Sequence, residues 1–119
     1  MKKKRVQFME HASVTPMDLL KQIAPEFAQN QFDQRALLFE SPKYQAVPLK
    51  YKLLAGIAVA AALGSVTCTE MWTKMALQKG VTPAEISEAI LVARYMKMAT
   101  VNDTASSSVA MILTQGKDK

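Results

Sequence analysis

Apolar residues recur along the chain with helical spacing, and the strict alternation that predicts strands is nearly absent. Thr15 and Pro16, followed by Asp18, supply a capping oxygen, a proline where no amide proton is needed, and an acid near the positive helix end. A helix is therefore predicted to begin at Pro16. Pro25 is expected to kink this helix, or to end it and start a second segment, and the apolar face stops before Pro42.

The middle of the chain predicts a third helix, rich in alanine. Val47-Pro48 opens it, and Gly64 is a suitable C-terminal glycine. The apolar run from Leu53 to Leu63 is much shorter than the roughly 20 residues needed to cross a bilayer. We therefore expect a buried helix here and no membrane partner.

Capping patterns mark the helices that follow. Ser65 and Thr67 are both candidate N-caps, and Thr67 and Glu70 have the spacing of a capping box. That helix is expected to run to Gly80. The clearest start signal in the chain is Thr82-Pro83-Ala84-Glu85, which combines a capping threonine, a proline and a glutamate at the third position.

The last part of the chain predicts a helix after Pro83 and a further segment over residues 102–115. The first carries an apolar face formed by four residues with helical spacing, Ile86, Ala89, Ile90 and Ala93. The second has small residues first and bulky ones later, which suggests tight packing at one end. The methionines are expected to fill gaps in the core or in a subunit interface. The pattern indicates an all-α bundle of about five to six helices.

The composition suits one domain: the chain has 119 residues and half of them are hydrophobic. The net charge of +5 arises at the two ends, because residues 1–5 contribute +4 and residues 117–119 contribute +1. The body in between has no net charge, so we expect no nucleic-acid partner. Residues 1–14 are predicted to be a flexible basic tail, and residues 15–116 a single helical domain.

Cysteine usage and the N-terminal sequence favour a cytoplasmic location. The basic start does not lead into a long apolar stretch, so no secretory signal is predicted. Cys68 is the sole cysteine, which excludes an intrachain disulfide framework and fits a reducing compartment.

The stretch from Tyr51 to Tyr95 resembles the carboxymuconolactone decarboxylase and alkylhydroperoxidase-D-like family. An alanine-rich helix ends at Gly64, a cysteine follows, and a helix ending at residues 76–80 precedes the segment Val81-Thr82-Pro83-Ala84-Glu85-Ile86-Ser87-Glu88-Ala89-Ile90 in matching order and spacing. The leading segment, residues 23–27, is also similar. This resemblance implies an all-helical subunit that assembles into homo-oligomers, either trimers or hexamers.

The resemblance also locates the family's chemical groups. Its redox branch reduces hydroperoxides with a C-x-x-C-x-x-x-H motif and a glutamate on the preceding helix. Carried over, the first cysteine falls on Ser65 and the second on Cys68, the histidine on Trp72 and the glutamate on Leu53. The decarboxylase branch keeps the histidine position, which is again Trp72. Neither set of catalytic groups is complete, so the sequence leaves open whether the chain is an enzyme.

Cys68 is the candidate catalytic residue that remains. A serine cannot resolve a sulfenic acid as a second thiol does, so Ser65 removes the intrachain cycle. Cys68 lies at the start of a predicted helix, where exposed amides and the helix dipole favour a thiolate. Against this, Trp72 replaces the proton acceptor with apolar bulk one turn along the same face. Both a reactive thiol and an inert packed residue remain open.

The other candidates are weaker. Glu70 would lie near the cysteine, where a capping role is favoured over a catalytic one. His11 is the chain's single histidine and lies in the predicted tail. No cluster of cysteine, histidine and acidic residues has the spacing of metal ligands, so neither a metal nor a cofactor is expected.

Three functional hypotheses follow. In the first, the chain is a weak or inactive relative that acts as an oligomeric small-molecule-binding protein, with a pocket at the family positions Leu53, Ser65, Trp72 and Glu70. In the second, it is a peroxiredoxin-type antioxidant oxidoreductase that uses Cys68 with an external thiol reductant. The third is decarboxylation of a carboxymuconolactone, which the missing histidine disfavours.

Overall fold

The computed structural model describes residues 14–118, and within them it contains helices and no strand. The predicted all-α class is confirmed. The predicted tail, residues 1–14, lies outside the described residues except for Val14. The chain forms two compact units, one ending at Ala46 and the other beginning at Val47, and the expected single domain over residues 15–116 stays a prediction.

The first unit contains the helices α2 (Pro16–Ile23) and α3 (Pro25–Phe39) and the short 3-10 helix η1 (Pro42–Tyr44). Thr15 caps α2 as predicted, because its hydroxyl accepts from the Asp18 amide at 3.2 Å and the Asp18 carboxylate accepts from the Thr15 amide at 3.1 Å. These bonds lower the pKa of the Asp18 carboxyl. The predicted break at Pro25 is also confirmed.

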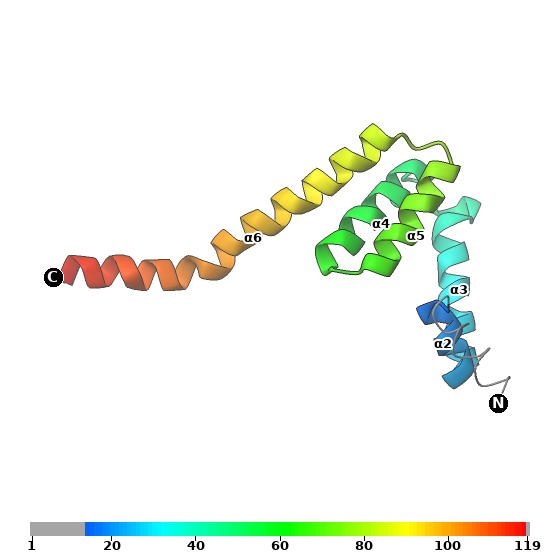
Figure 1. Ribbon diagram of the computed structural model, residues 1–119, viewed down its shortest axis with the longest axis horizontal. Coiled ribbons are helices and arrows are strands. Elements are labelled where there is room, and N and C mark those ends of the chain that lie inside the picture. The colour runs from blue at the N-terminus through cyan, green and yellow to red at the C-terminus, as the bar shows by residue number, and fades with distance from the viewer. Residues whose placement is uncertain (1–13, 119) are drawn as a thin grey trace, which may run out of the picture. The chain divides into compact units, whose positions relative to one another are not determined.

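The second unit contains α4 (Leu49–Leu63), α5 (Val66–Gln78) and α6 (Pro83–Asp118). Helix α4 packs against both α5 and α6, and Figure 1 shows α4 and α5 side by side. The buried face of α4 consists of Leu53, Ile57 and Ala60, whose spacing places them on one side of the helix. Gly64 ends α4 as predicted, in the left-handed conformation with φ of 83°.

The expectation for α4 is met in part in the single subunit, and the expectation for residues 102–115 is wrong. The apolar run of α4 is only partly buried, since Val59 is 56% exposed and Leu63 is 81% exposed. Residues 102–115 do not form a separate segment, because α6 continues from Pro83 to Asp118 without interruption. Asn102 is a poor helix former but is no barrier to a continuing helix, since the chain has no proline or glycine between Pro83 and Gly116.

Helix α6 bends about midway along its length (Figure 1). Two hydroxyls in this part donate back to carbonyls of their own helix: Thr100 to Lys97 at 2.7 Å and Ser106 to Asp103 at 2.8 Å. Such bonds compete with the helix ladder and commonly bend it. Within the described residues, no helix combines the length and hydrophobicity that a membrane span requires.

Candidate functional site

Ser65 is the N-cap of α5. Its hydroxyl accepts from the Cys68 amide at 3.2 Å, and its carbonyl accepts from the Thr69 hydroxyl at 2.6 Å. The predicted capping box of Thr67 and Glu70 is wrong, because both residues lie inside the helix. The position of the family's first cysteine thus holds a hydroxyl that satisfies an amide at the helix start.

Cys68 and Trp72 both lie on α5, one turn apart and therefore on the same face. Both are partly buried, and Cys68 is a free thiol. An indole nitrogen donates a hydrogen bond and does not accept a proton. Trp72 therefore cannot perform the proton transfer that a histidine at this position would provide.

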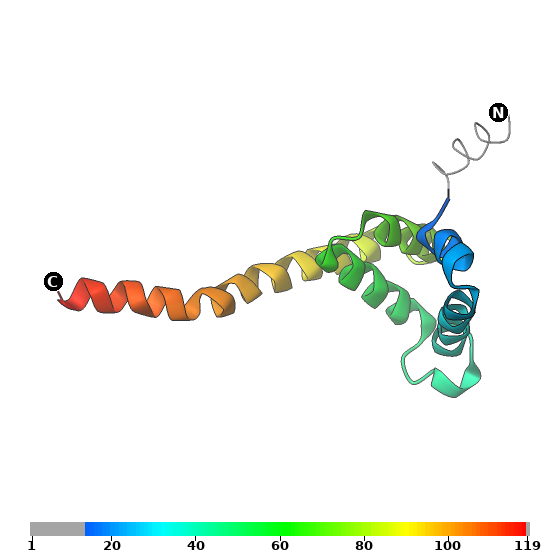
Figure 2. The ribbon, with the colours of Figure 1, turned by 90° about the horizontal axis from the view of Figure 1, so that it is seen from below.

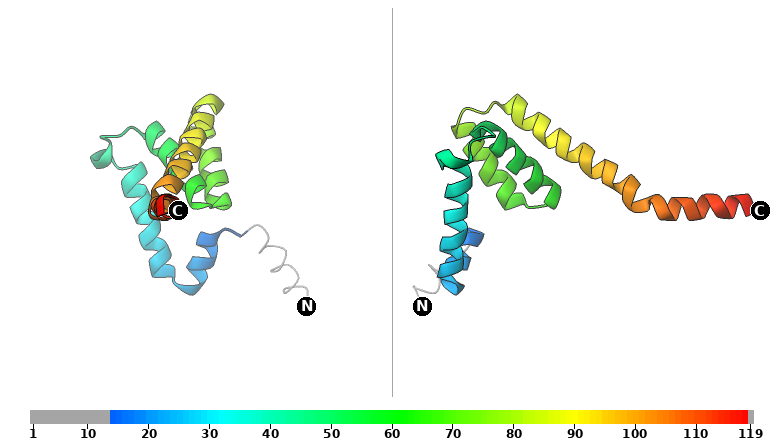
Figure 3. Two further views of the ribbon diagram at one scale, coloured as in Figure 1. Left: turned by 90° about the vertical axis from the view of Figure 1, so that its left-hand side faces the viewer. Right: turned by 180° about the vertical axis from the view of Figure 1, so that it is seen from behind.

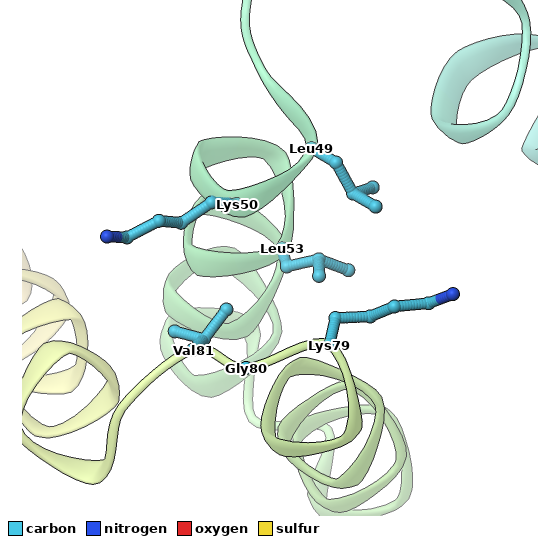
Figure 4. A pocket seen from close by; sticks show the side chains of 6 residues that line it. All are labelled: Leu49, Lys50, Leu53, Lys79, Gly80 and Val81. Carbon is cyan, nitrogen blue, oxygen red and sulfur yellow. The ribbon is translucent and has the colours of Figure 1, made fainter.

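Leu53 lines a pocket of about 180 Å³ in the second unit. It is 1% exposed and lies near the first turn of α4. The pocket is lined by residues from this turn and from the connection between α5 and α6: Leu49, Lys50, Leu53, Lys79, Gly80 and Val81. In Figure 4 the Lys50 and Lys79 side chains point away from one another on either side of Leu53. The two ammonium groups therefore do not converge on one anion.

This pocket lies at the far end of α5 from the cysteine. Lys79 follows Cys68 by eleven residues, which corresponds to about 16 Å along a helix axis. None of Ser65, Cys68 and Trp72 lines the pocket with Leu53. Its volume is also below the roughly 300 Å³ at which small-molecule sites usually begin. The four family positions thus do not surround this cavity in one subunit.

An ion pair that sequence reasoning missed joins two of the helices. The Lys50 ammonium on α4 is bonded to the Glu85 carboxylate on α6. Glu85 also completes the predicted capping box, because it accepts from the Thr82 amide at 3.0 Å and its own amide donates to the Thr82 hydroxyl at 3.1 Å. The Lys50 ammonium, with the Thr82 bonds, lowers the pKa of Glu85 to about 2. No local signal relates Lys50 to Glu85, because they are far apart in the sequence.

The lowered pKa of Glu85 predicts a specific dependence of stability on pH. Since the folded protein holds this carboxyl at a pKa of about 2, below its ordinary 4.5, the unfolded chain binds more protons between these values. The stability contributed by the carboxylate should therefore be present above pH 4.5 and lost as the pH falls towards 2. Urea unfolding of wild type and Glu85→Gln across this range should show a steeper loss in the wild type. Glu88→Gln, on the exposed surface of α6, is the matched control. Identical pH profiles for wild type and Glu85→Gln would contradict the assignment.

Of the remaining candidates, Glu70 and His11, the structure describes only Glu70. Glu70 is exposed on α5 and caps nothing. His11 lies outside the described residues. Over residues 14–118, no three side chains of histidine, cysteine, aspartate and glutamate gather closely enough to hold a metal ion.

The second unit carries many exposed apolar side chains. Met96 and Met98, expected in a core or an interface, are 57% and 56% exposed in the subunit. Large hydrophobic residues are also exposed on α4 and α5, among them Tyr51, Val59, Leu63, Val66 and Leu77. Exposed apolar residues of this size are candidates for a protein or ligand contact.

Comparison with known proteins places this geometry in a family. The chain is similar to a protein from Methanobacterium thermoautotrophicum of known crystal structure, with 26% identity and a TM-score of 0.69 over 77% of this chain and 97% of that one. No curated protein matches. The model of the carboxymuconolactone decarboxylase family matches residues 25–106. The chain therefore belongs to the carboxymuconolactone decarboxylase family.

Proposed function

We propose that this chain is an oligomeric small-molecule-binding member of its family that has lost the two-thiol relay. The observation that carries the proposal is the use of Ser65: the hydroxyl at the first cysteine position caps α5 by accepting from the Cys68 amide at 3.2 Å. A serine cannot form the disulfide that completes the relay. With Trp72 at the histidine position, the proton acceptor is absent as well.

The exposed apolar surface supports the oligomeric part of the proposal. Val59 and Leu63 on α4 and Val66 on α5 are each more than half exposed in the isolated subunit. Burial of these side chains in a subunit contact would favour association by roughly 25 cal/mol per Å² of apolar area. In a trimer or a hexamer, a partner subunit would bury these side chains.

The binding part of the proposal concerns the surface beside Trp72. Trp72 is partly buried, and its neighbour Met71 is 37% exposed. Apolar and polarisable groups therefore reach the surface of α5 here. The pocket that Leu53 lines is a separate cavity, because Trp72 does not line it. The proposed site is therefore completed by a second subunit, which would close over the Trp72 face.

Ligand binding can be followed through the chain's single tryptophan. Titration of the native oligomer with small aromatic and aliphatic compounds should change the Trp72 emission with a saturable dependence for at least one compound. The Trp72→Phe variant, probed calorimetrically with the same compound, should bind at least tenfold more weakly. Unchanged emission across the series, together with a protein that is monomeric at micromolar concentration, would overturn the proposal.

A second candidate function rests on the accessibility of Cys68. This thiol is free, partly exposed and located in the first turn of α5. In the reaction, the Cys68 thiolate attacks one peroxide oxygen, the O–O bond breaks, and the other oxygen leaves as the protonated alcohol. One external thiol then condenses with the sulfenic acid and releases water, and a second releases Cys68 as the external thiols become a disulfide.

Peroxide consumption distinguishes the two functions. If the binding proposal holds, wild type and Cys68→Ser should consume an organic hydroperoxide at the same rate in the presence of dithiothreitol, because Trp72 replaces the histidine that would activate the cysteine. A rate at least tenfold higher in the wild type would support the reductase instead. Ser65→Ala is the matched control, since it removes the cap and leaves the sulfur in place.

A further inference from the structure

Helix α6 extends well beyond the helices that it packs against. Ala93 is its last buried residue, and the Lys97 ammonium donates to the Ala62 carbonyl of α4 at 3.0 Å. From residue 100 to residue 116 every side chain is exposed except the partly buried Ala105. Figures 2 and 3 show this half of α6 running away from α4 and α5.

The sequence of this half does not favour an isolated helix. Between residues 100 and 109, Ala105 is the single residue of high helix propensity, and the others are threonine, valine, asparagine, aspartate and serine. Isolated helices shorter than about 12–15 residues are marginal in water even when they are rich in alanine. Most helical stability in proteins comes from packing, so this segment requires a surface to pack against.

One face of α6 carries a stripe with the spacing of a coiled coil. Seven residues lie at successive intervals of four and three positions along the chain. They define the α6 stripe: Leu91, Tyr95, Met98, Asn102, Ala105, Val109 and Ile112. Five of them are large apolar residues that are each about half to two-thirds exposed. A repeat of 3.5 residues keeps one seam of a helix turned towards a partner helix.

We propose that the α6 stripe of one subunit packs against the α6 stripe of a second copy of this chain. This inference rests on the oligomeric part of the proposed function and assigns the segment that forms the contact. Asn102 lies at the middle of the stripe, and its amide both donates and accepts, so it pairs with the Asn102 of the partner across a twofold axis. A single buried asparagine of this kind specifies register.

The near absence of charge in the segment favours a second copy as the occupant. Between residues 98 and 116, Asp103 is the single charged residue. A partner with a strongly charged surface would leave its own charges unpaired here, whereas a second α6 offers an equally uncharged face. Ala105 and Ser108 are small, which lets two backbones approach closely near the centre.

The exposed apolar residues of α6 contribute area to a dimer contact. A standard interface buries about 800 Å² on each partner. Eight large apolar side chains are exposed between residues 95 and 113 of α6, namely Tyr95, Met96, Met98, Val101, Val109, Met111, Ile112 and Leu113. Of these, Tyr95, Met98, Val109 and Ile112 belong to the α6 stripe, so the stripe supplies part of this area and the side chains that flank it supply more.

Sedimentation equilibrium of the full chain tests the contact. The double variant Val109→Lys with Ile112→Lys places charges in the α6 stripe, and it should weaken self-association at least a hundredfold. The control, Ser107→Lys with Thr114→Lys, places the same charges on the opposite face and should leave the mass unchanged. Lysine is a better helix former than all four residues it replaces, so helicity is not lost in the subunit.

The outcomes separate this inference from the proposed function. An oligomeric wild type with an equally oligomeric stripe variant would overturn the α6 contact alone. A monomeric wild type would overturn both. In a Cys68→Ser background, oxidation of Asn102→Cys should give a disulfide-linked dimer, whereas Ser107→Cys should remain unlinked; the reverse pattern would contradict the placement of Asn102 at the axis.

Discussion

Replacement of Leu53 by glutamate should lower the free energy of unfolding by about 3 kcal/mol or more at pH 7, because it leaves a buried carboxylate without a partner. Leu53 is 1% exposed, and Figure 4 shows the neighbouring ammonium groups of Lys50 and Lys79 pointing away from it. Since burial raises the pKa of the introduced carboxyl, the loss should be smaller at pH 4 and should grow towards pH 8. Urea unfolding at several pH values measures it.

The matched control for this substitution is Leu53→Met, which conserves volume and should cost less than about 1.5 kcal/mol at any pH. The comparison bears on function, because Leu53 occupies the position of the family's glutamate. A variant Leu53→Glu that is as stable as Leu53→Met would mean that Lys79 or Lys50 turns inward to pair with the acid. The site would then be able to accept the missing group.

Replacement of Ile57 by alanine should cost about 2–5 kcal/mol, since it opens a cavity at the centre of α4. Ile57 is fully buried, at 0% exposure, and lies on the face of α4 that packs within the second unit. For a small domain, a loss of this size also lowers the melting temperature by roughly 10 °C or more. Thermal unfolding followed by circular dichroism provides the measurement.

Val59→Ala on the same helix is the comparison for Ile57→Ala. Val59 is 56% exposed in the subunit, so its truncation should cost little at protein concentrations where the chain is dissociated. If the exposed face of α4 is covered by a partner, the effect of Val59→Ala should instead increase with protein concentration. Equal losses for the two variants in the dissociated chain would show that the core lies elsewhere.

The helix boundaries were largely predictable because their signals are local. Thr15 and Thr82 cap α2 and α6 as their neighbours Pro16 and Pro83 indicate, and each bond spans three residues. The prediction failed where two hydroxyls competed: Ser65 caps α5 and Thr67 does not. Both choices satisfy the local rule, and the left-handed turn at Gly64 decides between them by placing Ser65 at the helix start.

The sequence predicted which catalytic side chains of the family are absent here, but not how the remaining residues are arranged in space. The absence of a second cysteine and of a histidine near Cys68 can be read from the residues themselves. The position of Leu53 relative to Cys68 cannot be read from the sequence, because it depends on how α4 and α5 pack. The pocket that Leu53 lines with Gly80 and Val81 combines the start of one helix with the end of another.

Residue identity and short spacing were enough to predict the all-α class, most helix starts and ends, the family, and the absence of a second cysteine. The tertiary structure decided which apolar residues are buried: Ile57 is in the core and Leu63 is not. It also decided that Lys50 pairs with Glu85 and that α6 continues through residues 102–115. The reason is that burial and pairing depend on which helix faces meet, and residues distant in the sequence supply the opposing face.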